Sequence, residues 1–156
     1  MKKITVIQLG ILAIAVYILW FIALSRPDGK LHIAFLNIGQ GDSIYIKTPY
    51  GDDALIDGGP NDSVIRELVH VMAAGDRELS LVVATHPDAD HISGLISVLE
   101  RYSVREIWIN GAIHTSDTFI RLLKAIDEEK KSGAQVSVSV RGDRITWGAV
   151  SLLVLA

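Results

Sequence analysis

The sequence of 156 residues contains no cysteine. This excludes disulfide bonds and thiolate metal ligands, so any metal site in the chain must be built from histidine and carboxylate side chains. The sequence also lacks an excess of basic residues, because 15 Lys and Arg stand against 18 Asp and Glu and give a formal net charge of −3. Proteins that coat nucleic acid are strongly basic, so the overall charge gives no support to that class of function.

Charge is also absent from a long N-terminal segment, residues 4–25, which is almost entirely apolar. A helix of about 20 apolar residues can cross a bilayer, and residues 1–25 are therefore predicted to be a single-pass transmembrane anchor with a linker at 26–30. A cleaved signal peptide is the alternative, because the chain has a basic start and residues 23–25 resemble a cleavage site. The free α-amino group favours an N-terminus inside the cell and hence an extracytoplasmic domain.

Beyond residue 30 the spacing of apolar residues predicts strands and helices in alternation. The predicted strands are residues 31–38, 43–48, 54–57, 81–85, 106–109, 135–140, 144–147 and 149–155, and the predicted helices are residues 64–72, 92–101 and 116–131. The first three strands are expected to form an antiparallel meander, and the later alternation predicts an α/β domain with helices packed on a sheet. The apolar end of the chain indicates either a buried last strand or a larger fold cut partway through.

One hexapeptide, His86-Pro87-Asp88-Ala89-Asp90-His91, concentrates chemically active residues between a predicted strand and a predicted helix. Side chains at the carboxyl end of a buried strand face the crevice beyond the sheet. Imidazole and carboxylate groups together suit Zn²⁺, Mn²⁺ or Fe. A solvated turn with acidic capping residues is the alternative, but four potential ligands in six positions favour a metal site. The predicted ligands are His86, Asp88, Asp90 and His91.

The run from Thr85 to Leu95 resembles the metal-binding signature of the metallo-β-lactamase superfamily. Two earlier segments, residues 36–43 and 55–59, are similar to the hydrolase domain of its DNA-uptake competence (ComEC-type) branch. The resemblance implies an αββα sandwich, of which residues 31–156 would supply the N-terminal half behind the transmembrane helix. Members of the family take further ligands from the second half of the fold. In this sequence His114 is the only histidine after His91, and it is expected to be a loop or substrate-facing residue.

The resemblance also implies roles for individual residues. His86 would ligate a first divalent ion, and Asp90 and His91 a second, with Zn²⁺ expected and Mn²⁺ as the alternative. Asp88 stands where many relatives have histidine, and a carboxylate there makes the site more anionic and less selective for zinc. Asp90 would also contact the nucleophilic water as a catalytic residue.

Two further carboxylates are expected near this site. By the same resemblance, Asp57 looks like the family's supporting aspartate, which would orient the ligands by hydrogen bonding. Asp42 lies on a glycine-rich turn and either approaches the same crevice or is an ordinary turn carboxylate. Together these residues predict a membrane-anchored metal-dependent hydrolase of phosphodiesters or DNA. The alternatives are a non-catalytic anchored module that binds metal or a partner, and a truncated inactive fragment.

Overall fold

The computed structural model describes residues 5–24 and 27–155. Its main element is a six-stranded sheet in which the strands lie side by side in sequence order. The strands are β1 (His32–Phe35), β2 (Ile44–Lys47), β3 (Asp53–Ile56), β4 (Glu78–Ala84), β5 (Ser103–Ile109) and β6 (Gln135–Val138). β1, β2 and β3 are antiparallel neighbours, which confirms the predicted meander, whereas β3 to β6 are parallel.

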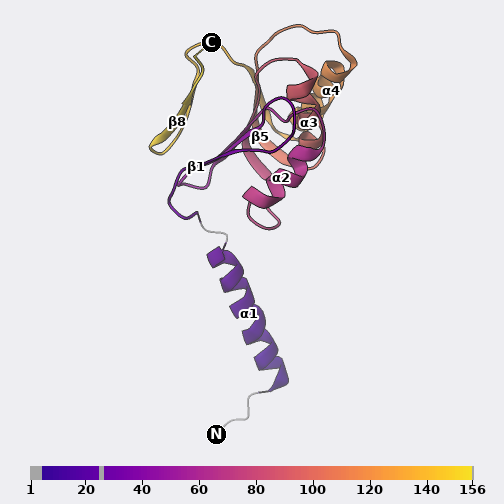
Figure 1. The fold of residues 1–156 in the computed structure, drawn as a ribbon. Coiled ribbons are helices and arrows are strands. Elements are labelled where there is room, and N and C mark those ends of the chain that lie inside the picture. Colours follow the sequence, from indigo (N-terminus) through magenta and orange to yellow (C-terminus); the bar gives the residue numbers. More distant parts are fainter. Residues whose placement is uncertain (1–4, 25–26, 156) are drawn as a thin grey trace.

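Helices α2 (Ser63–Val71), α3 (Ala89–Leu99) and α4 (Asp117–Ser132) connect the parallel strands. Such crossovers are almost always right-handed, and the strands are added in one direction, so the three helices lie on the same face of the sheet (Figure 1). The main core lies between this face and the helices, where strand residues meet helix residues that are equally buried: Tyr45, Leu55, Val82, Leu68, Leu95 and Leu122.

The ends of α4 show how local sequence sets an element's bounds. The Ser116 hydroxyl accepts a hydrogen bond of 3.2 Å from the amide of Phe119, which satisfies one of the free donors at the helix start. The helix ends at Gly133, whose φ of 115° lies in the left-handed region that glycine adopts without a steric penalty. The predicted helix at residues 116–131 is therefore confirmed almost to the residue.

The opposite face of the sheet is covered by a separate hairpin of β7 (Arg144–Trp147) and β8 (Val150–Leu153). Figure 1 shows this hairpin on the side away from α2, α3 and α4. Trp108 and Leu81 from the main sheet pack there against Trp147 and Leu152 of the hairpin. The chain therefore has an α/β architecture of three layers, helices, sheet and sheet, with a cavity of about 670 Å³ left between the two sheets.

The N-terminal segment forms helix α1, Val6–Leu24. Its side chains are exposed from Thr5 to Trp20, so they contribute nothing to the core. Within the described parts of the chain, none of the helices combines the length and the apolar character needed to cross a membrane. The transmembrane anchor predicted at residues 1–25 is therefore not supported: it was inferred from the length of the apolar run in the sequence, whereas a span requires one helix that is both long and apolar enough. Residues 1–4 and 25–26 of the predicted anchor and linker lie outside the described residues.

Two boundaries near the predicted site differ from expectation. β4 begins at Glu78 and not at residue 81, and α3 begins at Ala89 and not at residue 92. The earlier start of α3 places Asp90 and His91 in the first helical turn, where the prediction had left Asp90 in the preceding loop. The side chains of the two residues therefore leave a rigid element in fixed directions.

Candidate metal centre

The candidate site lies at the carboxyl ends of β3 and β4, which are parallel neighbours. Asp57 follows β3 directly, and Thr85 and His86 follow β4, so these three residues reach the same edge of the sheet. The Asp57 amide donates a 2.9 Å hydrogen bond to the Val83 carbonyl. Asp57 has φ of 57°, a left-handed conformation that is uncommon outside glycine and that directs the side chain away from the strand's regular alternation.

Close glycine contacts hold the start of α3 against the loop that follows β3. The Gly58 amide donates to the His91 carbonyl at 2.7 Å, and the Gly94 amide donates to the Gly59 carbonyl at 2.9 Å. A Cβ atom at Gly94 would lie 1.9 Å from the Gly58 carbonyl oxygen, a separation that no side chain can occupy. These positions must therefore be glycine for α3 to approach Asp57.

The approach of α3 allows one buried carboxylate to connect the ends of three elements. Asp57 is only 2% exposed. Its Oδ1 accepts from the Thr85 amide at 2.9 Å, and its Oδ2 accepts from the Thr85 hydroxyl at 2.5 Å. The same Oδ2 lies 2.9 Å from Nδ1 of His91. The Thr85 hydroxyl is in turn 2.8 Å from Nδ1 of His86, so that both imidazoles are held through their Nδ1 atoms.

The donor atoms at this edge fit a divalent ion. Asp57, His86 and His91 each offer one ligand atom, and these atoms lie within 4.8 Å of one another. Nε2 of His86 and Oδ2 of Asp88 are 3.6 Å apart, close to the separation of about 3.4 Å expected of two ligands of a tetrahedral ion. Because both oxygens of Asp57 already accept hydrogen bonds, its geometry suits a supporting carboxylate whose histidine partners keep Nε2 free.

The structure distributes the predicted site residues unevenly. Asp57, His86 and His91 come together, and the exposed Asp88 stands beside His86. Asp90, however, is not in that group: its Oδ2 lies 3.5 Å from the side-chain amide nitrogen of Gln40. The turn that carries Gln40 lies directly against α3. Its backbone approaches so closely at Gly41 that a Cβ atom there would lie 1.8 Å from the Asp90 carbonyl oxygen.

Two other predicted residues are less closely involved. Asp42 is exposed on the same glycine-rich turn, so the structure leaves its predicted role open. His114 lies before α4, where its Nδ1 accepts from the Ser116 amide at 3.2 Å. Neither residue belongs to the three-residue group of potential ligands at the end of β4.

Thr85 is the residue that reasoning from the sequence missed. It stood inside the recognised motif, but no role was given to it. The available signal was its position, since a hydroxyl residue directly after a strand can reach both the neighbouring strand's end and the following side chain. Gln40 was likewise quoted only as part of a motif, and its contact with Asp90 depends on a tertiary approach between residues 50 positions apart.

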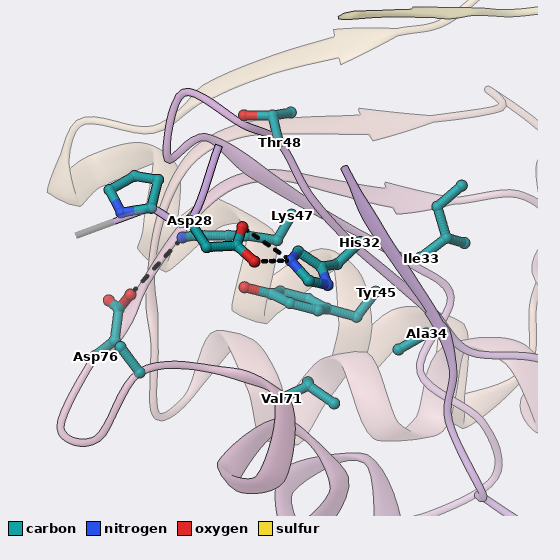
Figure 2. A pocket seen from close by; sticks show the side chains of 11 residues that line it. Asp28, His32, Ile33, Ala34, Tyr45, Lys47, Thr48, Val71 and Asp76 are labelled. Carbon is teal, nitrogen blue, oxygen red and sulfur yellow. Dashed lines mark hydrogen bonds and ion pairs between the residues drawn. The ribbon is translucent and has the colours of Figure 1, made fainter. Parts of the chain in front are cut away.

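A second polar cluster lies at the other end of the sheet, beside a pocket of about 420 Å³ (Figure 2). The Tyr45 hydroxyl donates to Oδ2 of the buried Asp53 at 2.9 Å, and Nζ of Lys47 donates to the same oxygen at 3.1 Å. Figure 2 shows Lys47 directed toward Asp76, at 4.0 Å, with a separate pair of Asp28 and His32 above the Tyr45 ring.

Burial and hydrogen bonding around this pocket shift the pKa values of two groups. Burial raises the pKa of the Tyr45 hydroxyl far above its usual range, and the neighbouring Asp53 carboxylate raises it further. The hydrogen bond from His32 lowers the pKa of the exposed Asp28. Because Lys47 pairs with the first residue of β3, this cluster is separated by the length of the strand from Asp57. The pocket therefore belongs to a different part of the molecule from the candidate metal centre.

The chain is similar in sequence and in fold to known proteins. Residues 36–150 match the family model described as the metallo-beta-lactamase superfamily. ComE operon protein 3 of Bacillus subtilis (strain 168) is 25% identical, over 86% of this chain and 19% of its own length. The Rm3 metallo-beta-lactamase is similar with a TM-score of 0.48 and 16% identity, over 84% of this chain and 52% of its own. The metallo-beta-lactamase SMB-1 gives a TM-score of 0.47 and 15% identity, over 82% and 53%.

The lengths covered are unequal. The chain spans about a fifth of the length of ComE operon protein 3 and about half the length of the two metallo-beta-lactamases. The match to the family model includes all three segments quoted above, from the turn after β1 through the start of α3, and continues to the first residue of β8.

Proposed function

Because the chain belongs to the metallo-beta-lactamase superfamily, we propose that it acts as a metal-dependent hydrolase of phosphodiester bonds, with nucleic acid as the substrate class. The observation that carries the proposal is the convergence of Asp57, His86 and His91 at one sheet edge. Proteins of this superfamily generally bind divalent metals, and this convergence offers such an ion both imidazole and carboxylate donors.

His86, Asp88 and His91 would hold the ion, and Asp57 would orient the two imidazoles. A divalent ion at this position supplies Lewis-acid chemistry, because it lowers the pKa of water and polarises a phosphoryl oxygen. We propose Zn²⁺, with Mn²⁺ as the ion to compare, since a site without thiolates and with Asp88 beside His86 also suits harder cations. The two histidines are attached to rigid elements, because His91 is on helix α3 and His86 follows the buried strand β4.

Asp90 is the proposed catalytic residue. Its carboxylate, in the first turn of α3, would accept a hydrogen bond from the attacking water and so direct a lone pair of that water toward phosphorus. The Gln40 amide, 3.5 Å from Oδ2 of Asp90, would limit rotation of this carboxylate. The pair lies on the side of α3 that the glycine-rich turn covers, next to His91.

Two observations support a nucleic-acid substrate. The segments around Asp57, Gly41 and His86 resemble the competence branch of the superfamily, and ComE operon protein 3 is 25% identical to this chain. The net charge of −3 does not favour tight binding of a polyanion. A bound cation would offset this repulsion at the site itself, where the scissile phosphate must lie.

A metal-binding module without hydrolytic activity is the second candidate. It is favoured by the state of Asp57, whose two oxygens both accept hydrogen bonds inside the protein. If Asp57 does not ligate, the described residues at this edge offer His86, Asp88 and His91, which is enough for one ion but leaves few donors for a second.

A metal and activity assay separates the two candidates. The full chain would be loaded with Zn²⁺ or Mn²⁺, dialysed and analysed for bound metal, and then tested on bis(p-nitrophenyl) phosphate and on single-stranded DNA. For the hydrolase we expect metal and turnover in the wild type, no metal in His86→Ala, and metal without turnover in Asp90→Ala. Bound metal without any turnover of either substrate would favour the module, and no bound metal would reject both.

A further inference from the structure

We propose that Thr85 is a positioning residue for the candidate metal centre. Its hydroxyl links Asp57 to His86 by two hydrogen bonds and so makes Nε2 the ligating nitrogen of that histidine. The inference rests on the metal-binding part of the proposed function. It concerns the protein without metal, however, and can be tested separately.

The direction of two hydrogen bonds carries the proposal. A threonine hydroxyl has a single hydrogen to donate, and a carboxylate only accepts. Because the Thr85 hydroxyl lies 2.5 Å from Oδ2 of Asp57, its hydrogen is directed to that oxygen. The hydroxyl oxygen is also 2.8 Å from Nδ1 of His86 and can therefore only accept there. Nδ1 of His86 must then carry the hydrogen, which leaves the lone pair on Nε2.

Asp57 is well placed to anchor this chain of hydrogen bonds. The backbone amide of Thr85 donates to Oδ1, which fixes the carboxylate in the acceptor role independently of any side chain. The Ser43 hydroxyl donates to the Asp57 carbonyl at 2.9 Å and ties the residue to the neighbouring strand. Asp57 reaches His91 directly, at 2.9 Å, but it holds His86 only through Thr85.

The result is that one buried carboxylate orients two imidazoles. The centroids of the His86 and His91 rings are 3.8 Å apart, so a rotation of either ring would disturb both. His86 follows a strand end and is 39% exposed in its side chain, whereas the His91 side chain is 13% exposed. The more exposed ring has fewer packing contacts to hold it, and the Thr85 hydroxyl supplies the missing restraint.

A purely structural role for Thr85 makes a different prediction. Threonine is favoured in strands because its side chain is β-branched, and valine has the same shape and the same preference. If only shape mattered, Thr85→Val would leave the site unchanged. If the hydroxyl matters, Thr85→Val would disturb His86, and Thr85→Ser would largely restore it, because serine keeps the oxygen while losing the branch.

The experiment uses the full chain as wild type, Thr85→Val, Thr85→Ser and the control Thr146→Val, an exposed position on β7 outside the site. Zn²⁺ affinity would be measured by competition with a chromophoric chelator. The hydrogen-bearing nitrogen of His86 would be identified in the metal-free wild type by long-range ¹H–¹⁵N correlation spectra. Thermal unfolding would show whether each variant folds.

We expect Thr85→Val to lower Zn²⁺ affinity by about tenfold to a hundredfold, the usual effect of removing a hydrogen-bond partner of a ligating histidine, with Thr85→Ser and Thr146→Val close to wild type. Wild-type His86 should carry its hydrogen on Nδ1. The proposal is overturned if wild-type His86 carries it on Nε2, or if folded Thr85→Val binds Zn²⁺ as the wild type does. Should Thr85→Val fail to fold, the wild-type spectrum still decides.

The same data distinguish a failure of this inference from a failure of the proposed function. A wild-type protein that binds no Zn²⁺, yet carries the His86 hydrogen on Nδ1, would reject the metal centre and keep the hydrogen-bond arrangement. A wild-type protein that binds Zn²⁺ with His86 in the other form would keep the metal centre and reject the role of Thr85.

Discussion

The amide of Gly58 donates a 2.7 Å hydrogen bond to the carbonyl of His91, so the loop after β3 is joined directly to the first turn of α3. Through this contact the buried Asp57 meets an imidazole 34 positions later in the chain. The hydrogen bond is possible only because the glycines on both sides let the two backbones touch. The candidate metal centre therefore depends on backbone packing as much as on its ligands.

Gly94→Ala tests that packing. The new Cβ would fall 1.9 Å from the Gly58 carbonyl oxygen, and we expect a loss of about 1–3 kcal/mol in the free energy of unfolding, typical of overpacking, together with weaker metal binding. Urea unfolding and metal titration provide the measurements. Gly10→Ala, in helix α1 with nothing within 4 Å of its Cβ, is the matched control and should not lower stability. Equal effects at the two positions would contradict the packing role.

Asp57→Asn separates the carboxylate from the backbone conformation. Asparagine tolerates the positive φ that residue 57 adopts, so the loop should keep its shape. The asparagine side chain has one uncharged oxygen in place of two charged ones, so it cannot accept from the Thr85 amide, the Thr85 hydroxyl and His91 together. We expect a loss of about 1–3 kcal/mol in unfolding free energy. Metal affinity should fall as well, because both histidines lose their common restraint. Unchanged affinity in a folded variant would remove Asp57 from the site.

If His91 ligates the ion, His91→Ala should lower metal affinity by about a hundredfold or more. Removing only the hydrogen-bond partner of a ligand already costs about tenfold to a hundredfold, and removing the ligand itself should cost at least as much. His70→Ala is the control, because His70 is an exposed residue on α2. Isothermal titration with Zn²⁺ checks both variants. If the two histidine variants bind Zn²⁺ equally well, the ion is held elsewhere and the assignment is wrong.

Tyr45 predicts a particular response to alkaline pH. Its folded-state pKa is raised, first by burial and then by Asp53, so its contribution to stability is complete below the unfolded pKa of about 10 and is lost as pH rises above that value. In an ultraviolet titration of phenolate, one of the 4 tyrosines should ionise only when the protein unfolds. Tyr45→Phe should abolish that late step.

The same substitution also tests the separation of the two clusters. Tyr45→Phe removes the hydrogen bond to Asp53, and we expect it to cost about 1–2 kcal/mol in unfolding free energy. Metal affinity should not change, because the Tyr45 hydroxyl contacts Asp53, which lies at the opposite end of β3 from Asp57. A parallel loss of metal affinity in a folded variant would show that the two ends are coupled.

The alternation of strands and helices was readable from the sequence because it depends on local spacing. The predicted elements all exist among the described residues, and their bounds differ most at strand ends and at the start of α3. For example, β1 ends at Phe35 and not at residue 38, and β5 begins at Ser103 and not at residue 106. The last two predicted strands were also correct, but nothing in their pattern showed that they form a separate hairpin over Trp108. The apolar N-terminal run correctly predicted a helix, whereas the transmembrane role predicted for that helix is not supported.

The sequence by itself determined the chemistry available: the absence of cysteine left imidazole and carboxylate groups, and the spacing from His86 to His91 placed four of them where a strand meets a helix. Only the tertiary structure decided which of these groups meet. Asp57 joins them because β3 and β4 are parallel neighbours, and Asp90 is set apart because the turn carrying Gln40 lies against α3. The periodicity of strands and helices depends on residues close together in the sequence. The contacts of Asp57 with His91 and of Gln40 with Asp90 depend instead on strand pairing and on close contacts at glycines far apart in the chain.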